Sequence, residues 1–186
     1  MTVVFTQTAT GVTGGVQQAY ALQHDPLLEG QLSDMRDNTI GTYINETAGV
    51  LAFGNVMVYN SGGTVANSAA TISGTADPVV GLNVLTYVDE TALDTNSRPG
   101  VKANQALNIA SQGAVAVYVH GAVNPSTVVR VIHSASGVEY AGQFRAAAVS
   151  GRTATLSNAR YLTSTTGSGL AVLEVNGPSF TLTANT

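Results

Sequence analysis

The pattern of apolar positions along the chain predicts short strands separated by turns. From Ile40 onward, runs rich in Val, Thr and Ala alternate with groups of Gly, Asn, Ser and Pro about every 8–15 residues. The strongest apolar runs span residues 50–59, 81–88, 114–120 and 127–133. Such spacing is typical of all-β domains. We therefore predict a single all-β domain, a β-sandwich or barrel of jelly-roll-like type.

Glycines within these runs predict local features of the sheet. Gly54 interrupts the first run, and a glycine inside a strand often marks a bulge or a close approach of another backbone. The runs 106–110 and 114–120 flank the turn-like sequence Ser111-Gln112-Gly113, which predicts that they form a hairpin. The candidates for inward-facing core positions are Phe53, Val56, Val115, Val117 and Val131.

The first 35 residues differ from the rest of the chain. Residues 17–28 hold helix-forming residues but meet Pro26 before two clean turns can form. We predict an extended arm over residues 1–35 and a β-domain over residues 36–186. The arm is too polar for a core of its own, so we expect its apolar side chains to contact another surface. These candidate interface residues are Phe5, Tyr20, Leu22, Leu27 and Leu28. The alternative is that the arm folds back as an edge strand of its own domain.

Composition narrows the classes of function. Charged residues make up 10% of the 186 residues, against about 25% in an ordinary soluble domain. The net charge is −4 and Lys102 is the single lysine, which disfavours both nucleic-acid binding and docking on an anionic membrane. The absence of cysteine excludes disulfides and thiolate metal sites. No apolar run approaches the roughly 20 residues of a membrane-spanning helix. A surface of Thr, Ser, Asn and Gln suits a protein that packs against other proteins.

No catalytic motif stands out in the sequence. The histidines His24, His120 and His133 lack the close spacing of a metal-ligand pair, and no G-x-S-x-G motif is present. Three acidic residues share one polar segment, namely Asp89, Glu90 and Asp94. Their spacing differs from that of an EF-hand loop, so we interpret them as a solvated loop and leave cation binding there open. We predict that the chain is not an enzyme and uses no cofactor.

Several short patterns occur in a recognisable order. They are Leu28–Asp34 (LEGQLSD), Val50–Val56 (VLAFGNV), Pro78–Leu82 (PVVGL), Arg98–Val101 (RPGV), Leu107–Ile109 (LNI) with Gly113–Val117 (GAVAV), and Ala159–Tyr161 (ARY) with Gly169–Leu173 (GLAVL). In this order they resemble the structural cement (decoration) proteins of tailed-bacteriophage capsids. The resemblance extends over residues 17–175.

The resemblance implies a structural role. Cement proteins of this kind are not catalysts; they are made in the host cytoplasm, sit on the capsid exterior of the virion and bridge neighbouring major capsid subunits. The expected partners are therefore the major capsid protein and further copies of the chain, as a dimer or trimer on a capsid symmetry axis. The alternative is a phage tail-fibre or receptor-binding (adhesion) head domain. The scattered positions of the seven tyrosines disfavour it, because sugar binding needs clustered aromatic residues.

Overall fold

The computed structural model describes residues 27–33, 37–85 and 91–185. These ranges contain strands and turns but no helix, so the all-β prediction is confirmed. It follows that none of the described residues belong to a helix long and apolar enough to cross a membrane. The predicted arm residues Phe5, Tyr20 and Leu22 lie outside the described ranges, as do Asp89, Glu90 and His24.

The described strands are short, apart from β8. In chain order they are β1 (Thr39–Asn45), β2 (Leu51–Ala52), β3 (Val56–Tyr59), β4 (Ser68–Thr71), β5 (Val79–Val84), β6 (Thr91–Leu93), β7 (Pro99–Val101), β8 (Ala106–His120), β9 (Arg130–Ile132), β10 (Phe144–Arg145), β11 (Thr153–Leu156), β12 (Ala159–Tyr161), β13 (Gly169–Asn176) and β14 (Leu182–Ala184).

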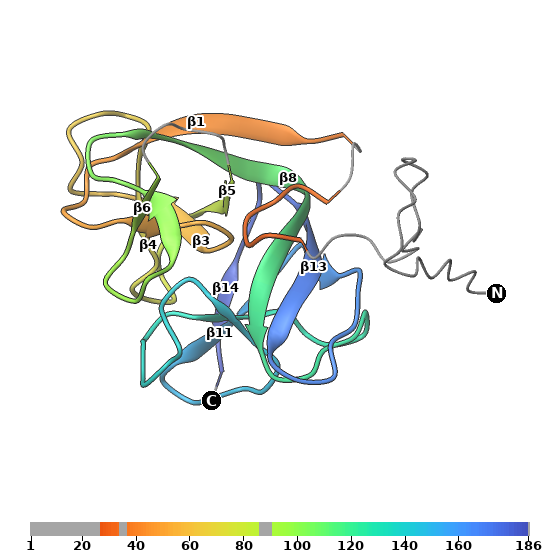
Figure 1. The fold of residues 1–186 in the computed structure, drawn as a ribbon. Helices are drawn as coiled ribbons and strands as arrows, with labels where there is room; N and C mark the ends of the chain where they lie inside the picture. Colours follow the sequence, from red (N-terminus) through yellow and green to blue (C-terminus); the bar gives the residue numbers. More distant parts are fainter. Residues whose placement is uncertain (1–26, 34–36, 86–90, 186) are drawn as a thin grey trace, which may run out of the picture.

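Five strands close into a barrel-like ring. Their order is β1-β4-β3-β5-β8, and β8 returns to pair with β1. Strand β1 runs parallel to β4, with Ile44 opposite Ser68, and antiparallel to β8. Ring closure leaves each of these five strands with a partner on both sides, which removes exposed edges from this part of the sheet. Figure 1 shows β1 and β8 side by side at one end of the molecule.

The second half of β8 belongs to a different group of strands. It pairs antiparallel with β13 over eight positions, from Gly169 opposite Val119 to Asn176 opposite Gln112. Strand β12 extends this group beyond β13, and the order β8-β10-β9-β11-β14 continues it in the other direction. Figure 1 shows β8 bending as it passes from β1 to β13. Strand β8 therefore connects the two halves of the fold.

The predicted hairpin between residues 106–110 and 114–120 is wrong. Residues 106–120 form one continuous strand, because the two halves of β8 pair with different strands and not with each other. Gly113 lies where the partner changes from β1 to β13, with φ at 136°. A Cβ there would lie 2.0 Å from Oδ1 of Asn38. The glycine thus permits a bend and a close contact within a strand rather than a turn.

The predicted core positions are confirmed. Phe53, Val56, Val115, Val117 and Val131 are each at most 1% exposed. The larger apolar cluster contains the three β8 and β9 valines together with Val56, and a second cluster contains Phe53. Apolar side chains of β8 thus contribute to the packing of both halves of the fold.

A three-stranded sheet, β2-β7-β6, covers part of the barrel. Strand β6 lies within the polar segment that holds Asp89, Glu90 and Asp94. The buried Asn83 holds this sheet on β5 by donating from Nδ2 to the carbonyl oxygens of Leu51 (2.9 Å) and Ala52 (3.0 Å). Gly100 permits the pairing of β2 with β7, since a Cβ there would lie 2.3 Å from the carbonyl oxygen of Leu51. This arrangement positions Asp94 and Arg98 beside the barrel.

Candidate functional site

The described part of the arm pairs with the barrel's own strand β8. We call residues 27–33 the lead segment. Gly30 N donates to the carbonyl oxygen of Ala116 (2.7 Å), Ala116 N donates to Gln31 (2.8 Å), and Ser33 N donates to Ala114 (2.9 Å). The lead segment thus contacts β8 between the positions that pair with β5 and those that pair with β10.

The local sequence of the lead segment explains its path. Gln31 N donates to the carbonyl oxygen of Leu28 (3.0 Å), and the Gln31 side chain accepts from Leu28 N (3.0 Å), which closes a tight turn. Gly30 takes a φ of 83° in this turn, and glycine alone adopts such a value without strain. Gly54 also has positive φ, and a Cβ there would lie 2.6 Å from Cγ of Glu29. The close approach predicted at Gly54 is therefore confirmed, and its neighbour is the lead segment.

Two of the predicted interface residues lie in the lead segment. Leu27 is half-buried, whereas Leu28 is 63% exposed. Phe5, Tyr20 and Leu22 lie outside the described residues. The structure therefore places one candidate, Leu28, as an exposed apolar side chain directly before Glu29.

Glu29 lies in the wall of a surface hollow of about 350 Å³. We call it the Glu29 hollow; its other main lining residues are Arg98, Tyr118, His120, Tyr140 and Gln143. Tyr118 and His120 are two residues apart on β8 and so share a face. The remaining residues come from the turn before β7 and the turn before β10. With Ser168, which lies directly before β13, the site is assembled from five segments that are distant in the sequence.

Burial raises the pKa of Glu29 from its ordinary 4.5 to about 7. The positive charge of Arg98 and the amide of Gln143 oppose this shift only in part. Oε1 of Glu29 is buried and has no hydrogen-bond partner. A carboxylate in this position costs stability when it is ionised, and such groups cluster at functional sites.

The positive charge of Arg98 is already matched. Its Nε and Nη2 atoms lie 2.9 and 2.7 Å from Oδ2 of Asp94. Its guanidinium group stacks over the Tyr140 ring, 4.6 Å from the ring centroid. Burial would raise the pKa of Asp94, but hydrogen bonds from the backbone N–H groups of Arg98 and Asn96 outweigh it, and the net pKa is lowered. Asp94 is therefore an ionised partner of Arg98, so Glu29 is the acid of the hollow without a dedicated cation.

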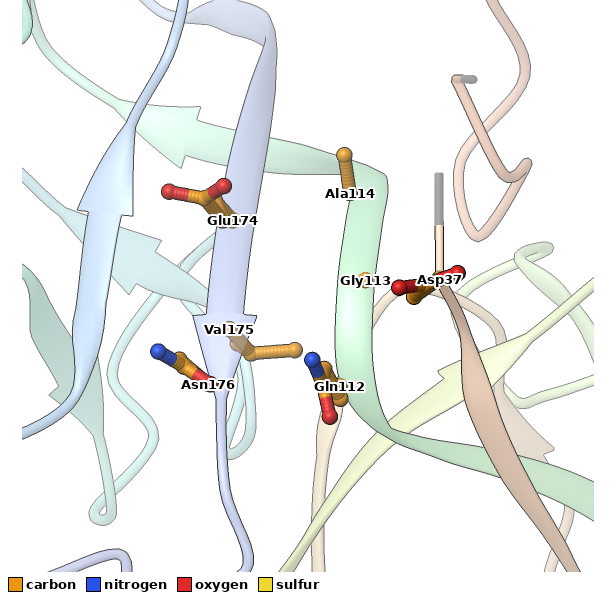
Figure 2. Close-up of a pocket in the computed structure, with 7 residues that line it drawn as sticks. All are labelled: Asp37, Gln112, Gly113, Ala114, Glu174, Val175 and Asn176. Atoms are coloured by element: carbon orange, nitrogen blue, oxygen red, sulfur yellow. The ribbon is translucent and has the colours of Figure 1, made fainter. Parts of the chain in front are cut away.

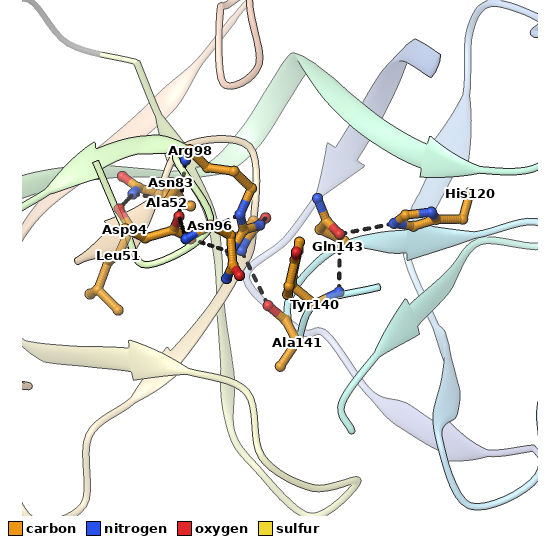
Figure 3. A network of polar contacts seen from close by, with 11 residues as sticks. Leu51, Ala52, Asn83, Asp94, Asn96, Arg98, His120, Tyr140, Ala141 and Gln143 are labelled. Carbon is orange, nitrogen blue, oxygen red and sulfur yellow. Dashed lines mark hydrogen bonds and ion pairs between the residues drawn. The ribbon is translucent and has the colours of Figure 1, made fainter. Parts of the chain in front are cut away.

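A polar network connects His120, Gln143 and Tyr140 in the lining of the hollow (Figure 3). Nε2 of His120 and Oε1 of Gln143 are 2.9 Å apart, and Tyr140 N donates to the same oxygen at 3.1 Å. The rings of Tyr118 and His120 meet edge to face at 5.1 Å. These contacts orient the side chains of Gln143, His120 and Tyr118 relative to one another.

Comparison with known proteins identifies the family of the chain. A family model described as structural cement protein (E217 gp24/Pam3 gp6) matches residues 16–176. The chain belongs to the phage structural cement proteins. Membership makes it a structural component of a phage capsid, with a cement or decoration role, and places it in the virion. The resemblance stated from the sequence is confirmed, and the fibre-head alternative is not favoured.

The fold of this cement protein is shared with a solved structure. A chain of "The capsid of Myoviridae Phage XM1" superposes with a TM-score of 0.61 at 14% sequence identity. The match covers 88% of the cement protein and 98% of that chain. At this identity the likeness is one of fold. No curated protein matches the chain.

The residues considered for chemistry do not assemble into a metal centre in the described part of the cement protein. No group of three or more histidine or acidic side chains is placed to hold a metal ion within residues 27–33, 37–85 and 91–185. His120 is engaged with Gln143, and Asp94 with Arg98. Asp89 and Glu90, the other two acids of the predicted polar segment, lie outside the described ranges.

A second hollow, of about 490 Å³, lies where β8 bends beside the end of β13. Its acidic residues are Asp37 and Glu174. Figure 2 shows the two carboxylates on opposite sides of β8, and Glu174 forms an ion pair with Arg160. Glu174 is therefore already engaged by a basic residue.

Sequence reasoning did not single out Glu29, Tyr118, Tyr140 or Gln143. The one available signal was the position of Glu29 between an apolar residue and a glycine in a charge-poor chain. That signal predicts a turn, but burial of the carboxylate depends on Gly54 and on residues near positions 98 and 143.

Proposed function

We propose that the cement protein binds the outer surface of a phage capsid and bridges neighbouring major capsid subunits. The observation that carries this proposal is the family match over residues 16–176. The all-β barrel, the low content of charge and the lack of a catalytic motif in the sequence support binding rather than catalysis. The protein would be made in the host cytoplasm and would join the capsid exterior.

The arm is the proposed main attachment element. The lead segment is fixed on β8 by backbone hydrogen bonds, so the residues before it start from a rigid root. We propose that residues 1–35 act as an arm on the domain formed by residues 36–186. The proposed contact residues are Phe5, Tyr20, Leu22, Leu27 and Leu28. An arm that adds to the edge of a neighbouring sheet gains backbone hydrogen bonds as well as apolar contacts.

Several attachment points on each assembly would strengthen overall binding to the capsid, even if each single contact is weak. Linked attachment points raise the overall affinity through effective concentration, without any new contact. We propose self-association as a dimer or trimer, since closed point-group symmetry is usual for homo-oligomers. Native mass spectrometry over a range of concentrations would test this, and a capsid map showing isolated monomers away from every symmetry axis would contradict it.

Deletion of residues 1–26 tests the role of the arm. This truncation keeps the lead segment and its hydrogen bonds to β8, so we expect a β-type circular dichroism spectrum and a cooperative melt. Co-sedimentation with capsids should fall to a small fraction of the full-length value. Undiminished co-sedimentation would place attachment elsewhere on the domain. Unfolding of the truncated chain would show that residues 1–26 are an intrinsic part of the domain.

A further inference from the structure

We propose that the Glu29 hollow is a socket for a cationic side chain, a lysine or arginine presented by the protein to which the cement protein attaches. This proposal rests on the proposed attachment function and specifies the chemistry of one contact with the attachment partner. Glu29 supplies the negative charge, and the ring of Tyr118 in the lining supplies a face that favours a cation. A volume of about 350 Å³ is at the lower end of the range for ligand pockets.

Charge balance argues for a cation as the occupant. Arg98 and Asp94 neutralise each other within 2.7 Å. When Glu29 is ionised, the hollow therefore holds one uncompensated negative charge, so an anion would be repelled. Arg98 stacks on Tyr140, so packing of a guanidinium group on an aromatic ring already occurs in the wall of the hollow.

The surroundings of the hollow argue for a protein as the source of that cation. Val138 at its rim is 74% exposed, and Leu170, which is 38% exposed, lies opposite Tyr118 across the β8–β13 pair. Leu28 adds a third exposed apolar side chain next to Glu29 in the sequence. Apolar side chains beside a socket for one charged anchor are the arrangement found at protein interfaces.

The chain's own described basic residues are engaged elsewhere, which favours a different protein over a second copy. Arg98 pairs with Asp94, Arg145 and Arg152 pair with Glu139, Arg160 pairs with Glu174, and Arg130 donates to the carbonyl oxygens of Val128 and Ala146. Lys102 also has a partner. A second copy that used one of these described residues would have to break its contact in order to fill the socket; Arg36 lies outside the described residues.

The burial of Glu29 couples cation binding to the protonation state of its carboxyl group. Without a cation the carboxyl group is protonated over much of the neutral range, because burial raises its pKa to about 7. A bound cation favours the ionised form and releases that proton. Binding should therefore tighten about tenfold between about pH 6 and about pH 8. The other titratable groups that face Glu29 are Arg98, Asp94, His120, Tyr118 and Tyr140.

The test is an NMR titration of the full-length protein with N-acetyl-arginine amide, with N-acetyl-norleucine amide as the uncharged control. We expect saturable shifts of the Tyr118 and Tyr140 ring signals with the arginine probe alone. We also expect the Glu29 carboxyl to titrate at lower pH when the probe is bound. Glu29→Gln should lose at least tenfold in affinity, and Tyr118→Leu should also weaken binding. His120→Gln should keep most of the pH dependence, because Glu29 causes it.

Two results of the titration would overturn the socket. Equal shifts with both probes would mean that the hollow takes any apolar chain, and equal affinity of wild type and Glu29→Gln would mean that the carboxylate is not the anchor. Capsid co-sedimentation then tests the source of the cation. Glu29→Gln should bind capsids more weakly than the control Glu46→Gln, and equal binding would overturn the assignment to the attachment partner. Failure of the wild type to bind capsids would count against the proposed function. The probe titration would still show whether the Glu29 hollow binds a cationic side chain.

Discussion

Gly30 donates its backbone N–H to the carbonyl oxygen of Ala116 at 2.7 Å. Its own carbonyl oxygen accepts from Leu85 N at 2.8 Å. One residue of the lead segment thus connects β8 to the residue that follows β5. This connection sets the position of Glu29, the next residue toward the N-terminus, and so determines the geometry of the hollow.

Gly30→Ala should destabilise the domain. The φ of 83° is unfavourable for alanine, and the new Cβ would lie 2.7 Å from Cβ of Phe53 and 2.9 Å from Gly54 N. We expect a loss of about 1–3 kcal/mol in the free energy of unfolding, measured by urea denaturation. Gly49→Ala is the matched control, because nothing lies within 4 Å of its Cβ position. Equal stability of the two variants would show that the turn at Gly30 relaxes freely.

Val117→Asp should unfold or severely destabilise the protein. Val117 is fully buried on β8 within the larger apolar cluster, and an unpaired carboxylate there costs several kcal/mol, of a total of about 5–15 kcal/mol. Thermal melting followed by circular dichroism measures the effect. Val128→Asp places the same group at an exposed position and should melt close to the wild type. A wild-type melting temperature for Val117→Asp would contradict the strand register of β8.

Glu29→Gln should change how stability depends on pH. Because the folded-state pKa of Glu29 is about 7 and its ordinary value is 4.5, the folded form binds more protons than the unfolded form between these values. The stability linked to this group is therefore fully present below pH 4.5 and is lost as the pH rises through 7. The free energy of unfolding of Glu29→Gln minus that of the wild type should therefore be larger at about pH 8 than at low pH. The increase should be up to about 3 kcal/mol.

Urea denaturation of both proteins at several pH values measures this difference. Glu46→Gln is the control, because hydrogen bonds from Thr64, Ser68 and Val65 lower the pKa of Glu46. Its effect on the pH dependence should have the opposite sign. A pH-independent difference between wild type and Glu29→Gln would show that Glu29 is solvated in the folded protein.

Attachment to capsids should depend only weakly on salt. The chain has seven basic and eleven acidic residues, so long-range attraction and counterion release contribute little. We expect the dissociation constant to rise by well under about tenfold between low and moderate ionic strength. A binding titration at several salt concentrations measures this. A steep slope of log affinity against log salt would contradict attachment through a charge-poor surface with one cationic anchor.

The sequence alone predicted several features of the fold and the family. The all-β class, the burial of Val117 and Val131, and the close approach at Gly54 all follow from local patterns, because runs of Val and Ala between turn residues predict buried strands and glycine tolerates contacts that a Cβ would block. The short patterns and their order along the chain also indicated the cement family, which the family model confirms. The division into arm and domain, and the contacts of Phe5, Tyr20 and Leu22, stay predictions.

The tertiary structure alone decided the path of β8 and the environment of Glu29. Residues 111–113 have the composition of a turn, but β1 and β13 come from distant parts of the chain and hold them extended through Gly113. Glu29 has the sequence of an ordinary turn acid, yet Gly54 and the residues near positions 98 and 143 enclose it and raise its pKa. In both cases the deciding groups are tens of residues away, and desolvation and strand pairing depend on which groups are neighbours in space.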